Sequence, residues 1–338
     1  MKKVALILIP LFYLFILIGC GGGSSPSTTT TSTTTTTSVT STTISGANWT
    51  QATGSADFSV RSSFSSVVFN DKMWVIGGFT DSVTNEVWSS SDGVVWDQVV
   101  GVADFYPRAK HSSVIFNDKM WVIGGMIGSG PVTNDAWYSD DGANWILATA
   151  EAGFSARSWH SSVVFNNKIW VIGGIDNGGL KNDVWSSSDG TIWSQATASA
   201  GFSARDVFAS VVFNNKIWVI GGNDSADYSG LKNDVWYSSN GVNWTLATAE
   251  AGFSAREGLA CVVYSGKMWV IGGCDPSYKS DVWSSADGIT WTQVTQEAAF
   301  ALREYPVGVV CTTEATEKMW IIGGYTYSGA VNDVWWTQ

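Results

Sequence analysis

Six arginines recur along this chain, each at the start of a similar stretch of sequence. Five of them lie 16 residues before a pair of glycines, and the sixth lies 20 residues before one. A guanidinium group binds a carboxylate or a sulfate through two parallel hydrogen bonds. Six such groups around one opening would therefore form a site for an anionic ligand. The arginines are Arg61, Arg108, Arg157, Arg205, Arg256 and Arg303.

A structural role is the alternative for these arginines. Arginine is almost never fully buried unless it is paired. Each one could pair with an acidic group or a carbonyl oxygen of the next repeat and hold the two repeats together. The spacing is compatible with both interpretations.

The residues that directly follow the arginines differ between the two halves of the chain. Neutral or basic residues follow the first three, including the only two histidines, whereas the carboxylates of Asp206, Glu257 and Glu304 follow the last three. Such an asymmetry on a repeating frame indicates a site. Glu257 and Glu304 are therefore candidate site residues. The further candidate ligand-binding residues are His111, Trp159, His160 and Tyr305.

The tryptophans reveal the elements that must position these residues. Eighteen of the twenty tryptophans occupy three positions of a unit that occurs six times. The first lies in W-V-I-G-G, the second closes a tetrad like N-D-V-W, and the third follows a D-G turn. Successive glycine pairs are 47 to 51 residues apart. A period of this size indicates a propeller or a solenoid.

Each unit contains four short runs rich in Val, Ile, Phe and Trp, which predict β-strands rather than helices. Asn166-Asn167 and Ser188-Asp189-Gly190 supply residues that tolerate the positive φ of tight turns. Four antiparallel strands repeated six times predict an all-β fold, a six-bladed β-propeller. In the third unit the four runs are S-S-V-V-F (161–165), K-I-W-V-I (168–172), D-V-W-S-S (183–187) and I-W-S-Q-A (192–196).

The first strand of the repeat region is expected to close the ring. The third tryptophan position follows a D-G turn four times and an N-G turn once, at Asn240-Gly241, and its sixth copy is Trp49 in G-A-N-W-T-Q-A-T. We predict that residues 46–53 pair as the outer strand of the blade formed by residues 303–337. This pairing would leave no sheet edge open. A linear β-solenoid would leave the Trp49 strand unexplained.

The unit R…S-S-V-V-F…W-V-I-G-G…N-D-V-W…W resembles the kelch repeat over residues 46–338. This resemblance implies a propeller but no single function, because kelch propellers include enzymes, sugar binders and protein-interaction modules. Histidine is common after the arginine of kelch repeats, which implies a structural alternative for His111 and His160. The S-S-D-G-x-x-W stretches are also similar to the Asp box of sialidases, which implies a turn in which Asp accepts backbone N–H groups.

The N-terminus predicts export from the cell. Two lysines and an apolar run precede Leu17-Ile18-Gly19-Cys20, which resembles a bacterial lipobox in which Cys20 is lipidated. We predict a signal peptide at residues 1–20 and a disordered Ser/Thr-rich tether at residues 21–45. The resemblance implies a lipid-anchored protein of the bacterial cell envelope, at the outer membrane because Gly21 follows the cysteine. A cleaved signal without lipidation is the alternative.

Composition restricts the partners. Without Lys2 and Lys3 the chain holds 16 basic and 29 acidic residues, a net charge of −13. This charge argues against nucleic acid or anionic lipid as a partner. Contact with a membrane is therefore expected through the lipid anchor alone. Three further cysteines show no metal-ligand spacing and are expected to be free thiols, namely Cys261, Cys274 and Cys311. We expect a monomer without metal or cofactor.

Binding is the first of three functions that these residues suggest. The loops after the glycine pairs differ between units, as in a scaffold that presents binding loops. No Ser-His-Asp arrangement, H-E-x-x-H or phosphate loop is present, which favours a non-catalytic module. Its partner would be an anionic glycan, an acidic peptide or an envelope protein held on the arginine face.

A sugar-active enzyme and a structural envelope component are the alternatives. A periplasmic kelch propeller resembles the N-acetylneuraminate mutarotase of bacteria. That resemblance implies an arginine for the substrate carboxylate, with Glu257 or Glu304 for proton transfer. A sialidase-like hydrolase is a variant of the same idea. The structural component would need no specific ligand.

Overall fold

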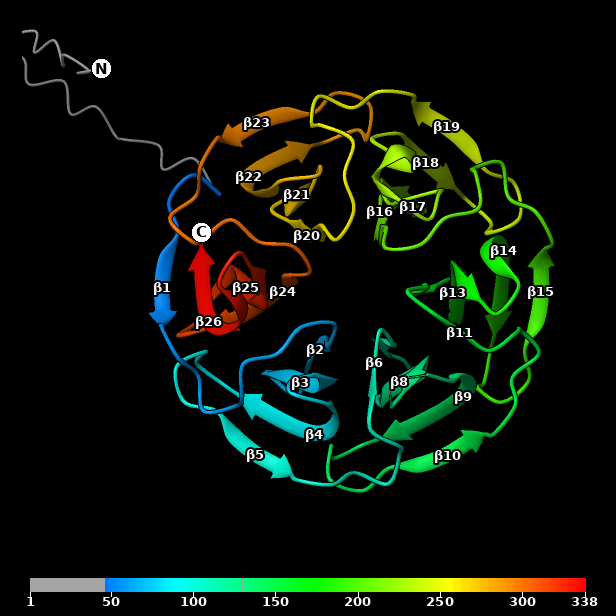
Figure 1. The fold of residues 1–338 in the computed structure, drawn as a ribbon, viewed down its shortest axis with the longest axis horizontal. Helices are drawn as coiled ribbons and strands as arrows, with labels where there is room; N and C mark the ends of the chain where they lie inside the picture. The colour runs from blue at the N-terminus through cyan, green and yellow to red at the C-terminus, as the bar shows by residue number, and fades with distance from the viewer. Residues whose placement is uncertain (1–45, 129) are drawn as a thin grey trace, which may run out of the picture. The chain divides into compact units, whose positions relative to one another are not determined.

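Each repeat folds into an antiparallel sheet, and six such sheets surround a central axis (Figure 1). The computed structural model describes residues 46–128 and 130–338. Within them, all elements except one short 3-10 helix, η1 (Tyr228–Gly230), are β-strands. The predicted all-β six-bladed propeller is therefore confirmed. The predicted signal peptide at 1–20 with Cys20 and the tether at 21–45 lie outside the described residues and stay predictions.

In each blade four strands follow one another from the axis outwards. In blades 2 and 3 a short segment at the arginine, β6 (Arg108–Ala109) or β11 (Arg157–Ser158), also pairs with the second strand. The strands of blades 1 to 3 are β2 (Ser65–Phe69), β3 (Lys72–Phe79), β4 (Val83–Ser90) and β5 (Asp97–Val100); β7 (Ser112–Ile115), β8 (Met120–Ile127), β9 (Val132–Ser139) and β10 (Ile146–Thr149); β12 (Ser161–Phe165), β13 (Lys168–Asp176), β14 (Gly179–Ser187) and β15 (Ser194–Thr197). Those of blades 4 to 6 are β16 (Ala209–Phe213), β17 (Lys216–Ile220), β18 (Val235–Ser238) and β19 (Thr245–Thr248); β20 (Ala260–Tyr264), β21 (Lys267–Cys274), β22 (Tyr278–Ser285) and β23 (Thr292–Thr295); β24 (Val307–Thr313), β25 (Thr316–Thr326), β26 (Gly329–Thr337) and β1 (Thr50–Thr53).

Blade 3 shows how the apolar runs relate to the strands. Strand β12 has the predicted bounds, and the hairpin after it has positive φ at Asn166 (49°) and Asn167 (55°), as predicted. The outer strand β15 begins at Ser194, two residues later than the predicted run. The reason is that Trp193 turns into the core, where its indole N–H donates to the carbonyl oxygen of Gly190 at 3.1 Å.

The turn between the third and fourth strands is held by its aspartate. In blade 1, Asp92 Oδ1 accepts hydrogen bonds from the backbone N–H groups of Val94 (2.8 Å) and Val95 (3.0 Å). The N–H of Gly93 donates to Ser90 Oγ at 2.8 Å. The hydrogen bonds predicted for this turn are therefore present.

The ring is closed by the N-terminal strand. Strand β1 pairs antiparallel with β26, with Gln51 opposite Trp335. The Trp49 ring packs edge-on against Phe300, with centroids 5.2 Å apart. The predicted pairing of residues 46–53 with the last blade is confirmed, with the regular strand confined to residues 50–53. Figure 1 shows β1 as the outermost strand beside β26.

The hydrophobic core lies between neighbouring blades. Buried apolar side chains form six clusters, and each cluster takes its members from two adjacent blades. One cluster, for example, joins Val75 of β3 to Ile322 of β25. In β3 the six residues from Met73 to Gly78 are all buried, because neighbouring blades cover both faces of the strand.

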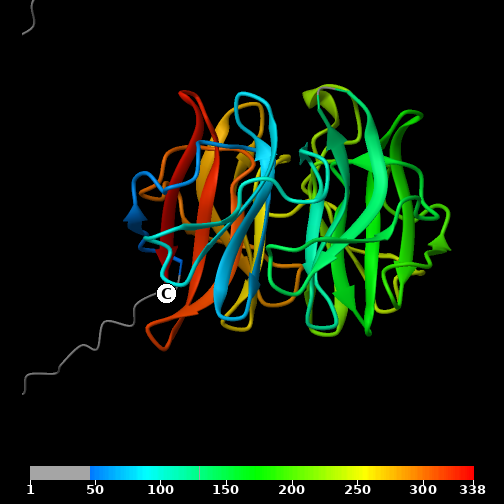
Figure 2. The ribbon, with the colours of Figure 1, turned by 90° about the horizontal axis from the view of Figure 1, so that it is seen from below.

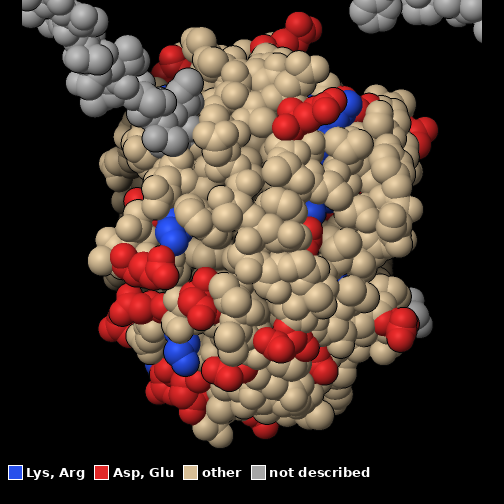
Figure 3. Space-filling model, turned by 90° about the vertical axis from the view of Figure 1, so that its left-hand side faces the viewer, with Lys and Arg blue, Asp and Glu red and all other residues tan. Residues whose placement is uncertain are grey.

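The connections that follow the glycine pairs lie together on one face of the ring, drawn uppermost in Figure 2. We call it the upper face, formed by the connections β3–β4, β8–β9, β13–β14, β17–β18, β21–β22 and β25–β26. The residue after each arginine lies here too, because it pairs with the residue after the glycine pair, as Glu304 does with Tyr325. On the flank at blade 6, acidic side chains outnumber basic ones (Figure 3). None of the described residues forms a helix long and apolar enough to span a bilayer.

Candidate functional site

The arginines are buried inside their own blades, and at most 1% of each is exposed. In blade 2, Arg108 donates from Nη1 and Nη2 to the two carboxylate oxygens of Asp135, both at 2.8 Å. Nη1 also donates to the carbonyl oxygen of Gly124 at 2.9 Å. Asp135 in turn accepts a hydrogen bond from the Trp137 indole at 2.7 Å. Arginine, glycine pair and third strand are thereby joined into one buried unit.

The same ion pair occurs in every blade, so the predicted rim of anion-binding guanidinium groups is not formed. A charged group removed from water must be paired, and the acidic residue two positions before the second tryptophan supplies the partner. This partner belongs to the same blade, not to the next one. The correction applies to Arg61, Arg108, Arg157, Arg205, Arg256 and Arg303, whose partners are Glu86, Asp135, Asp183, Asp234, Asp281 and Asp333.

The second residue after each arginine belongs to a ring of six residues around the axis. All six have a positive φ between 53° and 62°. Five backbone hydrogen bonds of 2.8 to 3.3 Å run from the N–H of one to the carbonyl oxygen of the one before. We call this set the axial ring: Ser63, Lys110, Trp159, Val207, Gly258 and Tyr305.

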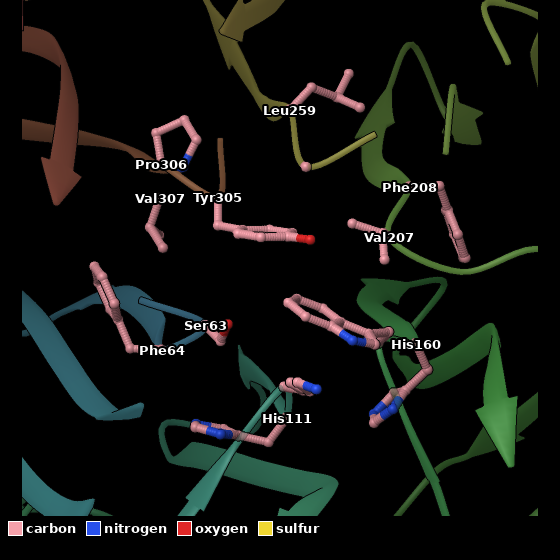
Figure 4. A pocket seen from close by; sticks show the side chains of 13 residues that line it. Ser63, Phe64, His111, His160, Val207, Phe208, Leu259, Tyr305, Pro306 and Val307 are labelled. Carbon is pink, nitrogen blue, oxygen red and sulfur yellow. The ribbon is translucent and has the colours of Figure 1, made fainter. Parts of the chain in front are cut away.

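An axial cavity of about 140 Å³ lies at the centre of the propeller. It is lined by the axial ring and by the residue after each of its members. Tyr305 projects toward the middle of this opening (Figure 4). The predicted residues His111, Trp159, His160 and Tyr305 are thus brought together, from blades that are far apart in sequence.

The two histidines join neighbouring blades. His111 Nε2 lies 2.8 Å from Ser65 Oγ, and His160 Nε2 lies 2.9 Å from Ser112 Oγ; each serine belongs to the preceding blade. Burial lowers the pKa of both histidines to about 3. Both imidazoles are therefore neutral near pH 7, which fits the structural alternative for them.

Trp159 and Tyr305 form a stacked pair across the axis. Their ring centroids are 4.7 Å apart, with 24° between the planes. The ammonium nitrogen of Lys110 lies 5.2 Å from the centroid of Trp159, within the range of a cation–π contact. The axial ring therefore carries an aromatic centre on an otherwise uniform frame.

Two hollows of the upper face adjoin this stacked pair, and both are lined by Trp159 and Tyr305. The Glu304 hollow, of about 310 Å³, extends over blades 6, 1 and 2 and is also lined by Phe79, Lys110 and Tyr325. The Glu257 hollow, of about 470 Å³, extends over blades 3 to 5 and is also lined by Asp206, Asn223 and Glu257. Both lie within the size range of small-molecule sites, roughly 300–1,000 Å³.

Three carboxyl groups in these hollows have no arginine partner. Glu257 Oε2 accepts a hydrogen bond from Asn223 Nδ2 at 3.0 Å, whereas Glu304 Oε2 is buried and has no hydrogen-bond partner among the described residues. Burial, with the charge of Glu257 added, raises the pKa of Asp206 and of Glu304 to about 7. Burial also raises the pKa of Glu257. Perturbed carboxyl groups in a hollow indicate a functional site.

The tyrosines of the upper-face loops were not among the predicted site residues. Tyr278 opposes the rise of the pKa of Glu304. The Tyr278 ring stacks on Tyr327 with centroids 4.5 Å apart. Tyr228 lies within electrostatic range of both glutamates. A signal was present, because the connections after the last three glycine pairs contain tyrosine and those after the first three contain none.

One of the cysteines lies beside the Glu257 hollow. Cys261, Cys274 and Cys311 are free thiols, as predicted. Cys274 pairs through its backbone with Glu257, but burial raises the pKa of its thiol to about 11, so it is not a reactive thiolate. Across residues 46–128 and 130–338, no three His, Cys, Asp or Glu side chains are placed to hold a metal ion.

The blades, their buried arginines and their glycine pairs define a kelch-type β-propeller. The sequence matches the KLHDC2/KLHL20/DRC7 Kelch-repeats domain over residues 16–222 and again over residues 141–306. The chain therefore belongs to this kelch-repeat family. No curated protein sequence matches it.

Solved structures share the fold. The structure of YjhT has a TM-score of 0.68 and 18% sequence identity, and the match covers 84% of this chain and 96% of that one. A likeness at this identity shows the fold alone. Because 542 solved chains match, the fold does not select a function.

Proposed function

We propose that this chain is a non-catalytic binding propeller whose ligand lies at the centre of the upper face, against Trp159 and Tyr305. One observation carries the proposal. The six blades repeat the same buried contacts, and the repetition ends where the stacked pair meets the carboxyl groups of Asp206, Glu257 and Glu304. A framework that is the same in every blade, with loops that differ between blades, is typical of a binding scaffold.

The ligand we propose differs from the anionic one that the arginines suggested. Each guanidinium group is neutralised by its own blade, and the hollows instead present carboxyl groups with a single nearby lysine, Lys110. An anionic glycan or acidic peptide would be repelled by Glu257 and Glu304 once they are ionised. A neutral or cationic partner fits these hollows better.

A retention assay tests the binding proposal. Full-length protein is immobilised and offered neutral and anionic glycans, basic peptides and envelope extract. Trp159→Ala should abolish retention of whatever the wild type holds, whereas Tyr106→Ala should not, because Tyr106 is an exposed aromatic outside the hollows. Equal retention by both variants would place binding elsewhere. No retention at all, with a weakened envelope in a knockout, would favour a structural component.

We also propose that the propeller is tethered to the bacterial cell envelope through a lipid on Cys20. The support is the lipobox-like Leu17-Ile18-Gly19-Cys20 and the Ser/Thr-rich stretch after it. Cells supplied with labelled palmitate should incorporate it into the wild type and not into Cys20→Ala. Labelling of both proteins to the same extent would disprove lipidation at this cysteine.

A sugar-active enzyme is the second candidate, favoured by one observation. Glu304 is buried, lacks a hydrogen-bond partner at Oε2 and has a pKa of about 7, which suits a group that both gives and takes a proton. The arginine required for a substrate carboxylate is lacking from the hollows, which disfavours sialic acid. Anomer exchange of sialic acid and of neutral sugars, followed by NMR, should be unaffected if the protein only binds. Faster exchange that Glu304→Gln removes would establish the enzyme instead.

A further inference from the structure

The upper face has a shortage of positive charge at its centre. Three lysines of its loops are already paired with aspartates of the same loops, at 2.7 to 3.0 Å. Lys110 is the one lysine that lines the Glu304 hollow. The three carboxyl groups of Asp206, Glu257 and Glu304 therefore face one nearby ammonium group.

Lys110 shows how an ammonium group is accommodated here. Its nitrogen lies over the Trp159 ring at 5.2 Å, and its charge opposes the rise in the pKa of Asp206. Glu304 lines the same hollow as Lys110, which is also walled by the aromatic rings of Tyr305 and Tyr325. No lysine or arginine of residues 46–128 and 130–338 donates to Oε2 of Glu304.

A metal ion is not the cation that best fits these carboxyl groups. Metal ions need several convergent ligands, and no three His, Cys, Asp or Glu side chains in the described part of the chain converge in that way. Aromatic faces beside a carboxylate instead suit a cation whose charge is spread over an organic group. Aromatic walls together with a carboxylate counter-ion therefore favour an organic cation over a metal ion.

We propose that the Glu304 hollow binds an organic ammonium group, with the Glu304 carboxylate as its counter-ion and with Trp159, Tyr305 and Tyr325 as its walls. This inference rests on the proposed function, since it names the ligand of the same site. Glu304 is 92% buried and its Oε2 is free, so an entering cation would supply the missing partner. The gain in binding free energy is large because a buried carboxylate without a hydrogen-bond or ionic partner destabilises the unliganded protein.

Proton release accompanies this binding. Without ligand, Glu304 is about half protonated at pH 7, because its pKa is about 7. An ammonium ligand favours the carboxylate, so binding displaces the proton and strengthens as the pH rises. The expected gain in affinity between pH 6 and pH 8 is up to about tenfold. The titratable and charged groups around Glu304 are Lys110, Asp206, Tyr228, Glu257, Cys274, Tyr278 and Tyr305.

Calorimetric titration of the full-length protein tests the inference. Choline and n-butylammonium are the probes, and 3,3-dimethylbutan-1-ol is the neutral isostere of choline. We expect the cations to bind and the alcohol to bind at least tenfold more weakly. Glu304→Gln should weaken cation binding at least fivefold and flatten its pH dependence. Glu317→Gln, an exposed change at the opposite end of blade 6, should do neither.

The two probes distinguish the source of the ammonium group. Stronger binding of choline indicates a quaternary headgroup, and stronger binding of n-butylammonium indicates a primary amine such as a lysine side chain; both support the inference. Equal binding of choline and its neutral isostere, or no binding of either cation, would overturn it. If the retention assay still finds a Trp159-dependent ligand, the proposed binding function is supported and only the proposal of an ammonium ligand is wrong.

Discussion

Arg108 makes four hydrogen bonds with its five N–H donors, all inside its own blade. Besides the two bonds to Asp135 and the bond to Gly124, its Nε donates to the carbonyl oxygen of Tyr106 at 3.2 Å. Removing one partner of a buried ion pair leaves the other charge unpaired, which is more costly than losing both. The arginines therefore stabilise the blades and do not contact ligand.

Arg108→Ala should destabilise the protein by about 3–5 kcal/mol, because Asp135 then remains buried and unpaired. The double variant Arg108→Ala/Asp135→Ala should recover part of this loss. Urea unfolding followed by circular dichroism measures both. A double variant that is less stable than the sum of the two single changes would contradict the pairing.

Glu304 makes the folded protein less stable as the pH rises. Its pKa is about 7 when folded, against 4.5 ordinarily, so the folded state retains a proton that the unfolded state has lost. The contribution of Glu304 to the free energy of unfolding is fully present below pH 4.5 and is lost as the pH rises through 7. Asp206 behaves in the same way from 3.8 to about 7.

Glu304→Gln should therefore gain stability relative to the wild type between pH 4.5 and pH 8, by roughly 1–3 kcal/mol. Thermal unfolding at several pH values measures the difference. Glu317→Gln should show a constant offset from the wild type over the same range. A Glu304→Gln curve parallel to that of the wild type would mean that this carboxyl titrates normally.

At the scale of elements, each turn between the third and fourth strands packs on the tryptophan of a neighbouring blade. Gly142 in blade 2 has a positive φ of 78°, and a Cβ added to it would lie 2.1 Å from the Trp74 ring of blade 1. The D-G turn thus combines a local hydrogen-bonded structure with a contact between blades.

Gly142→Ala should lower the stability by about 2 kcal/mol or more, through left-handed strain and the clash with Trp74. Gly101→Ala is the control, because its φ is ordinary and its nearest neighbours are 3.7 Å away at the flexible end of Gln98. Chemical denaturation should separate the two variants clearly. Equal stability would mean that the turn does not touch the indole.

The strands could be predicted from sequence because six copies repeat the same pattern. The apolar runs, the Asn-Asn hairpin and the D-G turn each depend on local chemistry. The predicted bounds of β12 therefore agree with the observed ones. The ion-pair partners of the arginines could not be predicted. Which acidic residue pairs with an arginine depends on how deeply the guanidinium group is buried in the blade, and the spacing of residues along the chain does not show this. The hollow around Glu304 depends on residues of blades 6, 1 and 2 that meet only in the folded ring.

In the whole molecule, the ring is closed because β1 completes blade 6, and we expect it to unfold as one unit. The fit of Gly46 against Trp269 repeats the fit of Gly142 against Trp74. The N-terminal segment is therefore equivalent to the outer strands of the other blades, although it comes from the start of the propeller.

Trp49→Ala and Trp193→Ala should destabilise the protein to a similar extent, by about 3–5 kcal/mol, because both indoles are 7% exposed in equivalent positions. Equilibrium unfolding should show one transition for each. A much milder effect of Trp49→Ala would show that the ring holds together without its N-terminal strand.

The proposed ligand lies at the centre of the upper face, where the repetition of the blades ends. A crystal structure of the full-length protein with choline at pH 8 tests this most directly. We predict choline density in the Glu304 hollow, with the ammonium within about 6 Å of the Trp159, Tyr305 or Tyr325 ring and beside the carboxylate of Glu304. An empty hollow at saturating choline, or choline bound only elsewhere on the ring, would contradict it.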